Sequence, residues 1–197
     1  MLVLTRTNFR KAPMQRYSKT AMLLHWLVAI LIIAAFFLGL TMVDIKGFSP
    51  TKLKYYSWHK WLGVTVLLLA AVRILWRKAT VPPPPPASLP QWQVKAADAM
   101  HYALYFFMFA VPLSGYLYTT AANVPVVYLG LWQIPALFEG TPELKEFFKP
   151  IHYWLNMAMA AAVLAHAGAA LKHHFIDRDD VLKRMLPKLP DLSKLRN

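Results

Sequence analysis

The chain has 197 residues, of which 57% are hydrophobic and only 16% are charged, whereas about a quarter of the residues of a soluble protein are charged. This composition excludes a disordered or collagen-like chain. The absence of cysteine excludes a disulfide scaffold, an iron–sulfur cluster and a thiol nucleophile. The composition indicates a small, basic membrane protein. Its formal net charge of +13 could indicate binding of nucleic acid, and the positions of the charges along the chain test this possibility.

Four long apolar segments follow one another along the chain. They cover residues 20–43, 55–76, 98–119 and 149–174, and a helix of this length crosses about 30 Å of hydrocarbon. They are too long for strands and too continuous for the amphipathic helices of a soluble protein. The first is also too long for the apolar region of a cleaved signal peptide. The sequence predicts an all-α, integral membrane four-helix transmembrane bundle, with residues 1–197 in a single domain.

The lysines and arginines indicate the orientation of these helices. With both termini inside, sixteen of them lie on inner segments and six on outer segments. The positive-inside rule therefore predicts that both termini are cytoplasmic. The same distribution explains the positive charge as a basic collar that flanks the membrane, so nucleic acid is not expected as a partner.

The connections carry further information. Five consecutive prolines, at residues 82–86, predict a stiff polyproline spacer between the second and third helices. The connection around residues 124–138 is apolar and contains prolines. We expect it to lie at the outer membrane interface as a short helix that caps the bundle. The chain beyond Pro187 is expected to be irregular.

Histidines supply the chemistry of the apolar segments, because ionisable groups within a membrane are costly and indicate function. His25 lies about one turn inside the inner leaflet, and His59 lies near the outer surface. On the fourth helix His152 lies near the outer side, and His166 lies 14 residues further on, about 21 Å deeper and on the same face. A single histidine could merely bond a neighbouring helix. Together they predict two pairs, His59 with His152 and His25 with His166.

Two imidazoles from opposing helices suit a haem iron better than a zinc ion. Zinc takes four ligands in structural sites and three protein ligands plus water in catalytic sites. Axial imidazoles hold haem iron, and bundle cores bind such cofactors. Small residues must then make room for the macrocycle, although tight helix packing is the alternative role for each. These residues are Gly39, Gly63, Gly115 and the stretch 158–170.

A set of motifs in the chain resembles the bacterial cytochrome b561 family, which is related to the cytochrome b subunits of nickel–iron hydrogenases and formate dehydrogenase. The resemblance covers roughly residues 16–187, whereas residues 1–14 lie outside it. It rests on Tyr17-Ser18, His25-Trp26, His59-x-x-x-Gly63, Arg73, His101, Pro112-x-x-Gly115, His152 and His166. The ending His173-His174-Phe175 with Leu182-Lys-Arg-Met-Leu-Pro187 is similar to short, stand-alone members that oxidise superoxide.

The resemblance implies a multi-pass protein of the bacterial inner membrane with two b haems. It implies that His25 and His166 are the axial ligands of the inner haem iron, and that His59 and His152 are those of the outer one. Arg73 lies 14 residues inward from His59 on the same side of its helix. It either neutralises a propionate of the inner haem or snorkels to the cytoplasmic surface.

Three histidines remain near the inner face. His173 lies seven residues beyond His166, about 10.5 Å further along the same face. An imidazole there could bond a quinone carbonyl and pass protons. For His101, a quinone role and a hydrogen bond at the membrane boundary stay equally open. His174 is rotated away from this face and is expected at the interface.

The implied activity is transmembrane electron transfer, as a superoxide:ubiquinone oxidoreductase that oxidises superoxide outside and reduces ubiquinone near the cytoplasmic side. Lysines of the first outer loop could steer superoxide or be ordinary solvated residues. These are Lys46, Lys52, Lys54 and Lys60. The alternative is a membrane-anchor cytochrome b subunit, which relays electrons between a dehydrogenase or a periplasmic redox partner and quinone. The same lysines would then dock an acidic partner protein.

Overall fold

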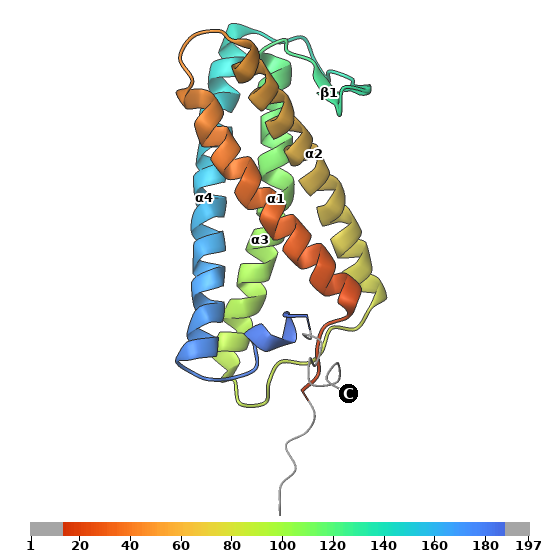
Figure 1. Cartoon of the computed structure of the whole chain (residues 1–197), viewed down its shortest axis with the longest axis vertical. Coiled ribbons are helices and arrows are strands. Elements are labelled where there is room, and N and C mark those ends of the chain that lie inside the picture. Colours follow the sequence, from red (N-terminus) through yellow and green to blue (C-terminus); the bar gives the residue numbers. More distant parts are fainter. Residues whose placement is uncertain (1–13, 188–197) are drawn as a thin grey trace, which may run out of the picture.

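The computed structural model describes residues 14–187, which form four long helices and a small hairpin (Figure 1). The helices run alternately up and down the long axis, and neighbours in the chain pack side by side. A two-stranded sheet lies between the third and fourth helices, and a single 3₁₀ turn follows the fourth. The helices are α1 (Lys19–Asp44), α2 (Pro50–Ala79), α3 (Gln91–Ala121) and α4 (Pro142–Phe175), with β1 (Val126–Tyr128), β2 (Trp132–Ile134) and η1 (Leu182–Arg184). The prediction of a helical protein is confirmed.

Three helices within residues 14–187 are long and apolar enough to cross a membrane, namely α1, α3 and α4. The helix α2 is also long, with 30 residues, but its charges make it less apolar. These charges are Lys52, Lys54, Lys60, Arg73, Arg77 and Lys78. The span expected over residues 55–76 and the cytoplasmic location of the termini therefore stay predictions.

Polar caps determine where three of the helices begin. The hydroxyl of Ser18 accepts a hydrogen bond from the Ala21 amide at the start of α1, and Ser49 and Thr141 cap α2 and α4 in the same way. Such caps satisfy backbone amides that have no partner within the helix. Because residues rise 1.5 Å along a helix, these starts set the levels of the histidines on α1, α2 and α4 along the bundle.

The centre of the bundle is a small apolar core to which each long helix contributes one buried residue. These residues are Val28, Ala70, Met108 and Met159. On α4, which carries a histidine of each pair, Met159 falls between His152 and His166, so the core lies between the two histidine levels. Large apolar side chains such as Ile30, Phe37 and Leu164 are instead exposed on the outside, as expected for a surface that faces lipid.

The prediction of a short helix between α3 and α4 is wrong, because this connection forms an antiparallel hairpin. Val126 of β1 pairs with Ile134 of β2, and the chain turns at Leu129 and Gly130, which both have positive φ. The hairpin packs against α2, where Trp61 Nε1 donates a hydrogen bond of 2.7 Å to the carbonyl of Val127. This docking supplies partners that a short isolated hairpin lacks.

The end of the described chain returns to its beginning. The segment 181–187 crosses beneath α1 (Figure 1), where the Tyr17 amide donates to the carbonyl of Arg184 over 3.2 Å. Trp26 Nε1 donates to the carbonyl of Met185 over 2.9 Å. We call residues 181–187 the C-terminal strap. The predicted irregular tail beyond Pro187 and the N-terminal extension lie outside the described residues, except for Met14.

Candidate functional site

The histidines at the outer level face one another across the bundle. The ring centroids of His59 on α2 and His152 on α4 are 6.3 Å apart, and the ring planes are 85° apart. A bond between a metal and an imidazole nitrogen is about 2.0–2.1 Å long, so the two rings are close enough to ligate one ion between them. The structure thus brings together two histidines that are 93 positions apart in the chain.

Hydrogen bonds hold both outer imidazoles in the tautomer that a metal requires. His59 Nδ1 lies 2.9 Å from the carbonyl oxygen of Ala35, which only accepts, so this nitrogen carries the proton. His152 Nδ1 lies 3.0 Å from Ser114 Oγ, which donates its own proton to the carbonyl of Val111. In both rings Nε2 therefore keeps its lone pair, as in metal-binding histidines whose other nitrogen donates to a neighbour.

An apolar cavity of about 310 Å³ opens between the helices at this level and is lined by both histidines. Gly63 lines the cavity, and a methyl group there would meet nothing within 4 Å. Gly39 and Gly115 have a different role, because a Cβ would lie 3.1 Å from His59 Cε1 and 2.8 Å from His152 Cε1, respectively. These two glycines make room for the imidazole rings themselves.

The inner level holds three imidazoles rather than two. The ring centroids of His25 on α1 and His166 on α4 are 6.1 Å apart. His101 on α3 lies on His166 as well, with its ring centroid 5.6 Å away. The structure therefore brings together the predicted pair and adds His101, which sequence reasoning had placed only near the inner face.

The side chain of Arg73 reaches His25 on the neighbouring helix α1. Its Nη2 lies 3.0 Å from His25 Nδ1, and its guanidinium lies 5.5 Å from the centre of the Tyr105 ring. A guanidinium only donates, so His25 Nδ1 accepts this bond. The inner site thus differs from the outer one, where each Nδ1 donates.

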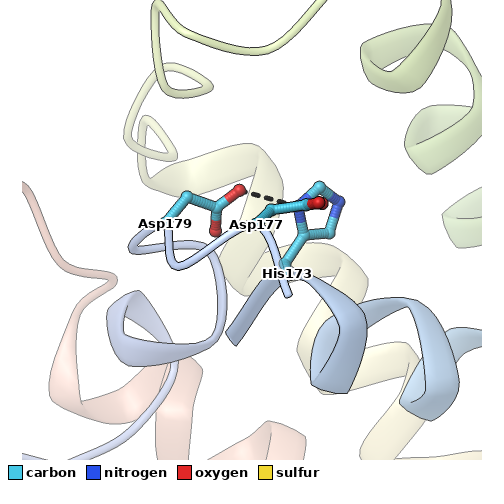
Figure 2. Close-up of side chains that lie close together, drawn as sticks. All are labelled: His173, Asp177 and Asp179. Carbon is cyan, nitrogen blue, oxygen red and sulfur yellow. Dashed lines mark hydrogen bonds and ion pairs between the residues drawn. The ribbon is translucent and has the colours of Figure 1, made fainter. Parts of the chain in front are cut away.

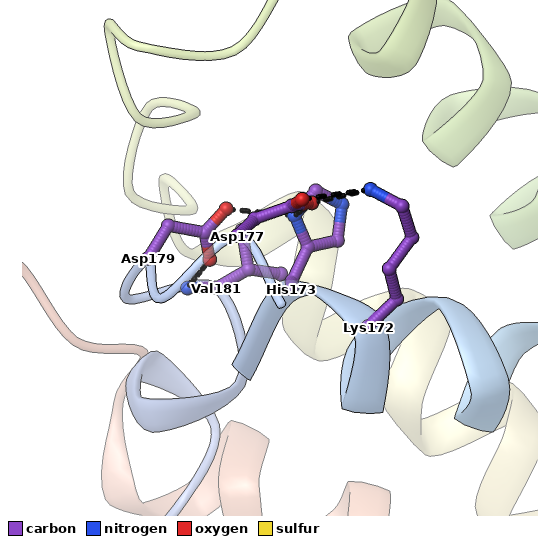
Figure 3. A network of polar contacts seen from close by, with 5 residues as sticks. All are labelled: Lys172, His173, Asp177, Asp179 and Val181. Carbon is purple, nitrogen blue, oxygen red and sulfur yellow. Dashed lines mark hydrogen bonds and ion pairs between the residues drawn. The ribbon is translucent and has the colours of Figure 1, made fainter. Parts of the chain in front are cut away.

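His173 lies at the end of α4 within a network of polar contacts (Figures 2 and 3). Its Nδ1 is 2.7 Å from Asp179 Oδ2 and 3.2 Å from Asp177 Oδ2. Lys172 Nζ lies 2.6 Å from Asp177, and the Val181 amide donates to the other oxygen of Asp179. Sequence reasoning missed both aspartates, although their spacing of four and six residues after His173 places them where the helix ends.

The imidazole and the two carboxylates of this network lie close enough to hold a metal ion. Lys172 nevertheless already neutralises Asp177, and Asp179 already accepts bonds from His173 and Val181. These partners satisfy the cluster without an ion. The ring of the neighbouring His174 packs edge-on against Phe175, with centroids 4.7 Å apart.

Three lysines of the outer end contact carbonyl groups or a ring. Lys52 Nζ donates to the carbonyl of Ile45 over 2.7 Å, and Lys60 Nζ donates to that of Pro125 over 2.9 Å. Lys54 lies over the Trp58 ring, 4.7 Å from its centre. Only Lys60 of these three also lines the cavity of His59 and His152.

Known proteins resemble this chain along almost its whole length. The model of the family described as prokaryotic cytochrome b561 matches residues 16–188. Cytochrome b561 homolog 2 of Escherichia coli K12 is 37% identical, over 92% of this chain and 96% of the relative. Cytochrome b561 homolog 1 of the same strain is 32% identical, over 89% and 99%. The probable superoxide oxidase CybB of Yersinia pestis is 29% identical, over 88% and 97%.

Proposed function

The chain belongs to the prokaryotic cytochrome b561 family, and on that premise we propose that it is a superoxide:ubiquinone oxidoreductase with two b haems. Membership of the family makes it a membrane-bound haem b protein of electron transfer. The observation that carries the finer proposal is the presence of two opposed histidine pairs at two levels of one bundle. Haem held between each pair would supply one-electron carriers between the two sides of the membrane.

The proposed topology is a multi-pass protein of the bacterial inner membrane with four spans and both termini in the cytoplasm. In this topology α2 crosses the membrane together with α1, α3 and α4. It packs against both α1 and α3 and carries His59 at the outer level. The alternation of the helices brings the start of α1 and the end of α4 to one end of the bundle (Figure 1). Among residues 14–187, most of the lysines and arginines belong to the segments at that end, in agreement with the positive-inside rule.

The outer site fits haem through its donor atoms, since Nδ1 carries the ring proton in both His59 and His152, and both residues line an apolar cavity. The lone pair of His152 Nε2 accepts a hydrogen bond from Asn156 Nδ2 over 3.3 Å, a contact that an iron would replace. At the inner site, ligation by His25 Nε2 would place the ring proton on Nδ1. Arg73 would then lose its present acceptor, because a guanidinium cannot accept that proton. The freed guanidinium is suited to a carboxylate, which supports its proposed role beside a haem propionate.

Superoxide oxidation at the outer side is supported by Lys60. Its ammonium group is held beside the cavity of the outer histidines, where a fixed positive charge raises the local concentration of a small anion. The name of the Yersinia pestis relative points to the same substrate. Each superoxide loses one electron and becomes dioxygen, while ubiquinone takes up two electrons and two protons.

Ubiquinone reduction near the cytoplasmic side is assigned to the end of α4. The contact with Asp179 keeps the proton of His173 on Nδ1, so Nε2 is the atom available to a quinone carbonyl or to a proton in transfer. His101 lies against His166 and is the second candidate for contact with the quinone ring.

Purified full-length protein tests the proposal directly. A pulse of superoxide should reduce the haem and, with ubiquinone present, should yield ubiquinol and dioxygen without hydrogen peroxide from those electrons. A protein that contains haem but is not reduced by superoxide would contradict this activity. Such a result would favour the membrane-anchor subunit, and capture of a redox partner through the outer lysines would then be the informative measurement.

A further inference from the structure

A second cavity, of about 400 Å³, lies at the inner end of the bundle. It is bordered by the start of α1, the end of α2, the first part of the proline linker and the C-terminal strap. Three guanidinium groups and two phenol rings line it. We call it the arginine pocket, and these residues are Arg16, Arg73, Arg77, Tyr17 and Tyr105.

No arginine of the arginine pocket forms an ion pair with a carboxylate among residues 14–187. The ion pairs of that part of the chain involve Lys149, Lys172, Lys183 and His173, and none involves an arginine. Arg16 instead donates to the carbonyl of Leu186 over 2.8 Å, and Arg73 donates to His25. Positive charges gathered in one cavity at a membrane boundary are costly unless an anion accompanies them.

The pocket also lies where a helix begins. Ser18 caps α1 and lines the pocket together with Ala21, so the positive end of the α1 dipole adds to the field of the arginines. The indole of Trp76 already donates to Ser18 Oγ over 3.1 Å, which leaves the guanidinium groups as the main charged donors. A guanidinium binds phosphate oxygens in a two-pronged manner that a lysine cannot reproduce.

We propose that the arginine pocket binds the phosphate of an anionic phospholipid. Basic pockets at the cytoplasmic ends of transmembrane helices are suited to such headgroups. Val72 and Leu75, which precede Arg77 on α2, are exposed and offer an apolar surface to the acyl chains beside the headgroup. The assignment to the cytoplasmic leaflet rests on the proposed topology, whereas the binding itself does not.

A haem propionate has the same charge chemistry and is the other source of an anion here. Arg73 is the arginine that reaches into the bundle, toward His25. Arg77 lies one turn nearer the end of α2, about 6 Å away along the axis, and its side chain makes no hydrogen bond or ion pair with a described residue. The lipid phosphate is therefore assigned to Arg16 and Arg77 rather than to Arg73.

A bound phosphate would join three segments that are distant in the chain. Arg16 connects the N-terminal segment to the strap through Leu186, and Arg77 belongs to the end of α2. Anionic lipid should consequently stabilise the folded protein as well as bind it. This gives the proposal a readout that does not depend on haem reduction or quinone.

Native mass spectrometry of the delipidated, haem-loaded, full-length protein tests the proposal with phosphatidylglycerol and phosphatidylcholine of identical acyl chains. Phosphatidylglycerol should bind more tightly and should raise the unfolding temperature. The Arg77→Gln variant should lose about five-fold in phosphatidylglycerol affinity, the factor that corresponds to about 1 kcal/mol for one basic residue near an anionic surface. Lys78→Gln is the matched control, because it removes the same charge from the adjacent, exposed position outside the pocket.

Equal affinity for the two lipids, or equal losses in the Arg77→Gln and Lys78→Gln variants, would overturn the proposal in favour of a diffuse basic collar. Binding of phosphatidylglycerol only after haem is removed would also overturn it, because propionates would then fill the pocket. The Arg77→Lys variant keeps the charge and should retain part of the lipid preference. If Arg77→Gln does not fold, this variant and the comparison of the two lipids on the unmodified chain decide the outcome.

Discussion

Replacement of Gly115 by alanine should displace His152 and weaken haem binding at the outer site. A Cβ at position 115 would lie 2.8 Å from Cε1 and 3.2 Å from Nδ1 of His152, whereas ordinary contact begins near 3.4 Å. The ring must therefore move by roughly 0.6 Å, which exceeds the ~0.5 Å within which a functional site holds its groups. The same movement strains the bond from Nδ1 to Ser114.

The effect on stability combines two opposing contributions. Alanine in a helix interior is favoured over glycine by about 0.5–1 kcal/mol, and overpacking of a close contact costs about 1–3 kcal/mol. Gly115→Ala should therefore destabilise the protein by up to about 2.5 kcal/mol. Gly168→Ala is the control, since a Cβ there meets nothing within 4 Å, and this variant should be neutral or slightly more stable.

Pyridine haemochrome analysis and thermal unfolding of the two purified variants measure both effects. The haem content of Gly115→Ala should fall from two toward one haem per chain, while Gly168→Ala should keep two. Gly39→Ala, whose Cβ would lie 3.1 Å from His59 Cε1, should have a smaller effect of the same kind. Full haem content with an unchanged spectrum in Gly115→Ala would refute the reasoning, because His152 would then not be confined by the glycine.

The remaining predictions concern the inner haem, the quinone site and the outer lysine. His166→Ala should remove the inner haem and leave the outer one, and loss of only the outer spectral signal would contradict the proposed pairing. His173→Ala and Asp179→Asn should keep both haem spectra while slowing reoxidation of the haem by ubiquinone; loss of a haem would show that His173 is a ligand. In stopped-flow measurements, Lys60→Gln should slow haem reduction by superoxide more than Lys54→Gln does, and added salt should reduce the difference because exposed charges are screened over about 8 Å at physiological ionic strength. A rate that does not depend on salt or on either lysine would refute steering.

The helices and the levels of their histidines could be derived from the sequence because both depend on local rules. Apolar length predicts where a chain can cross a membrane, and a constant rise per residue converts spacing into depth. The proximity of His59 to His152 and of His25 to His166 follows from these rules. The helix α2 marks the limit of this reasoning. It is long enough to cross a membrane, but its charged residues make it less apolar than the other three helices, so its length alone does not identify it as a span.

The helical architecture and the histidines that share a level can thus be derived from local sequence patterns, whereas the partners of the polar groups depend on how distant segments pack. The hairpin after α3 depends on a bond from Trp61, 66 positions away from Val127. The contact of Arg73 with His25 and the contact of Arg16 with Leu186, 170 positions apart, arise only when helices and termini pack together. The spacing of residues within a segment does not predict such contacts. Each helix can form without them, and they arise only when segments that are distant in the chain come together in the folded protein.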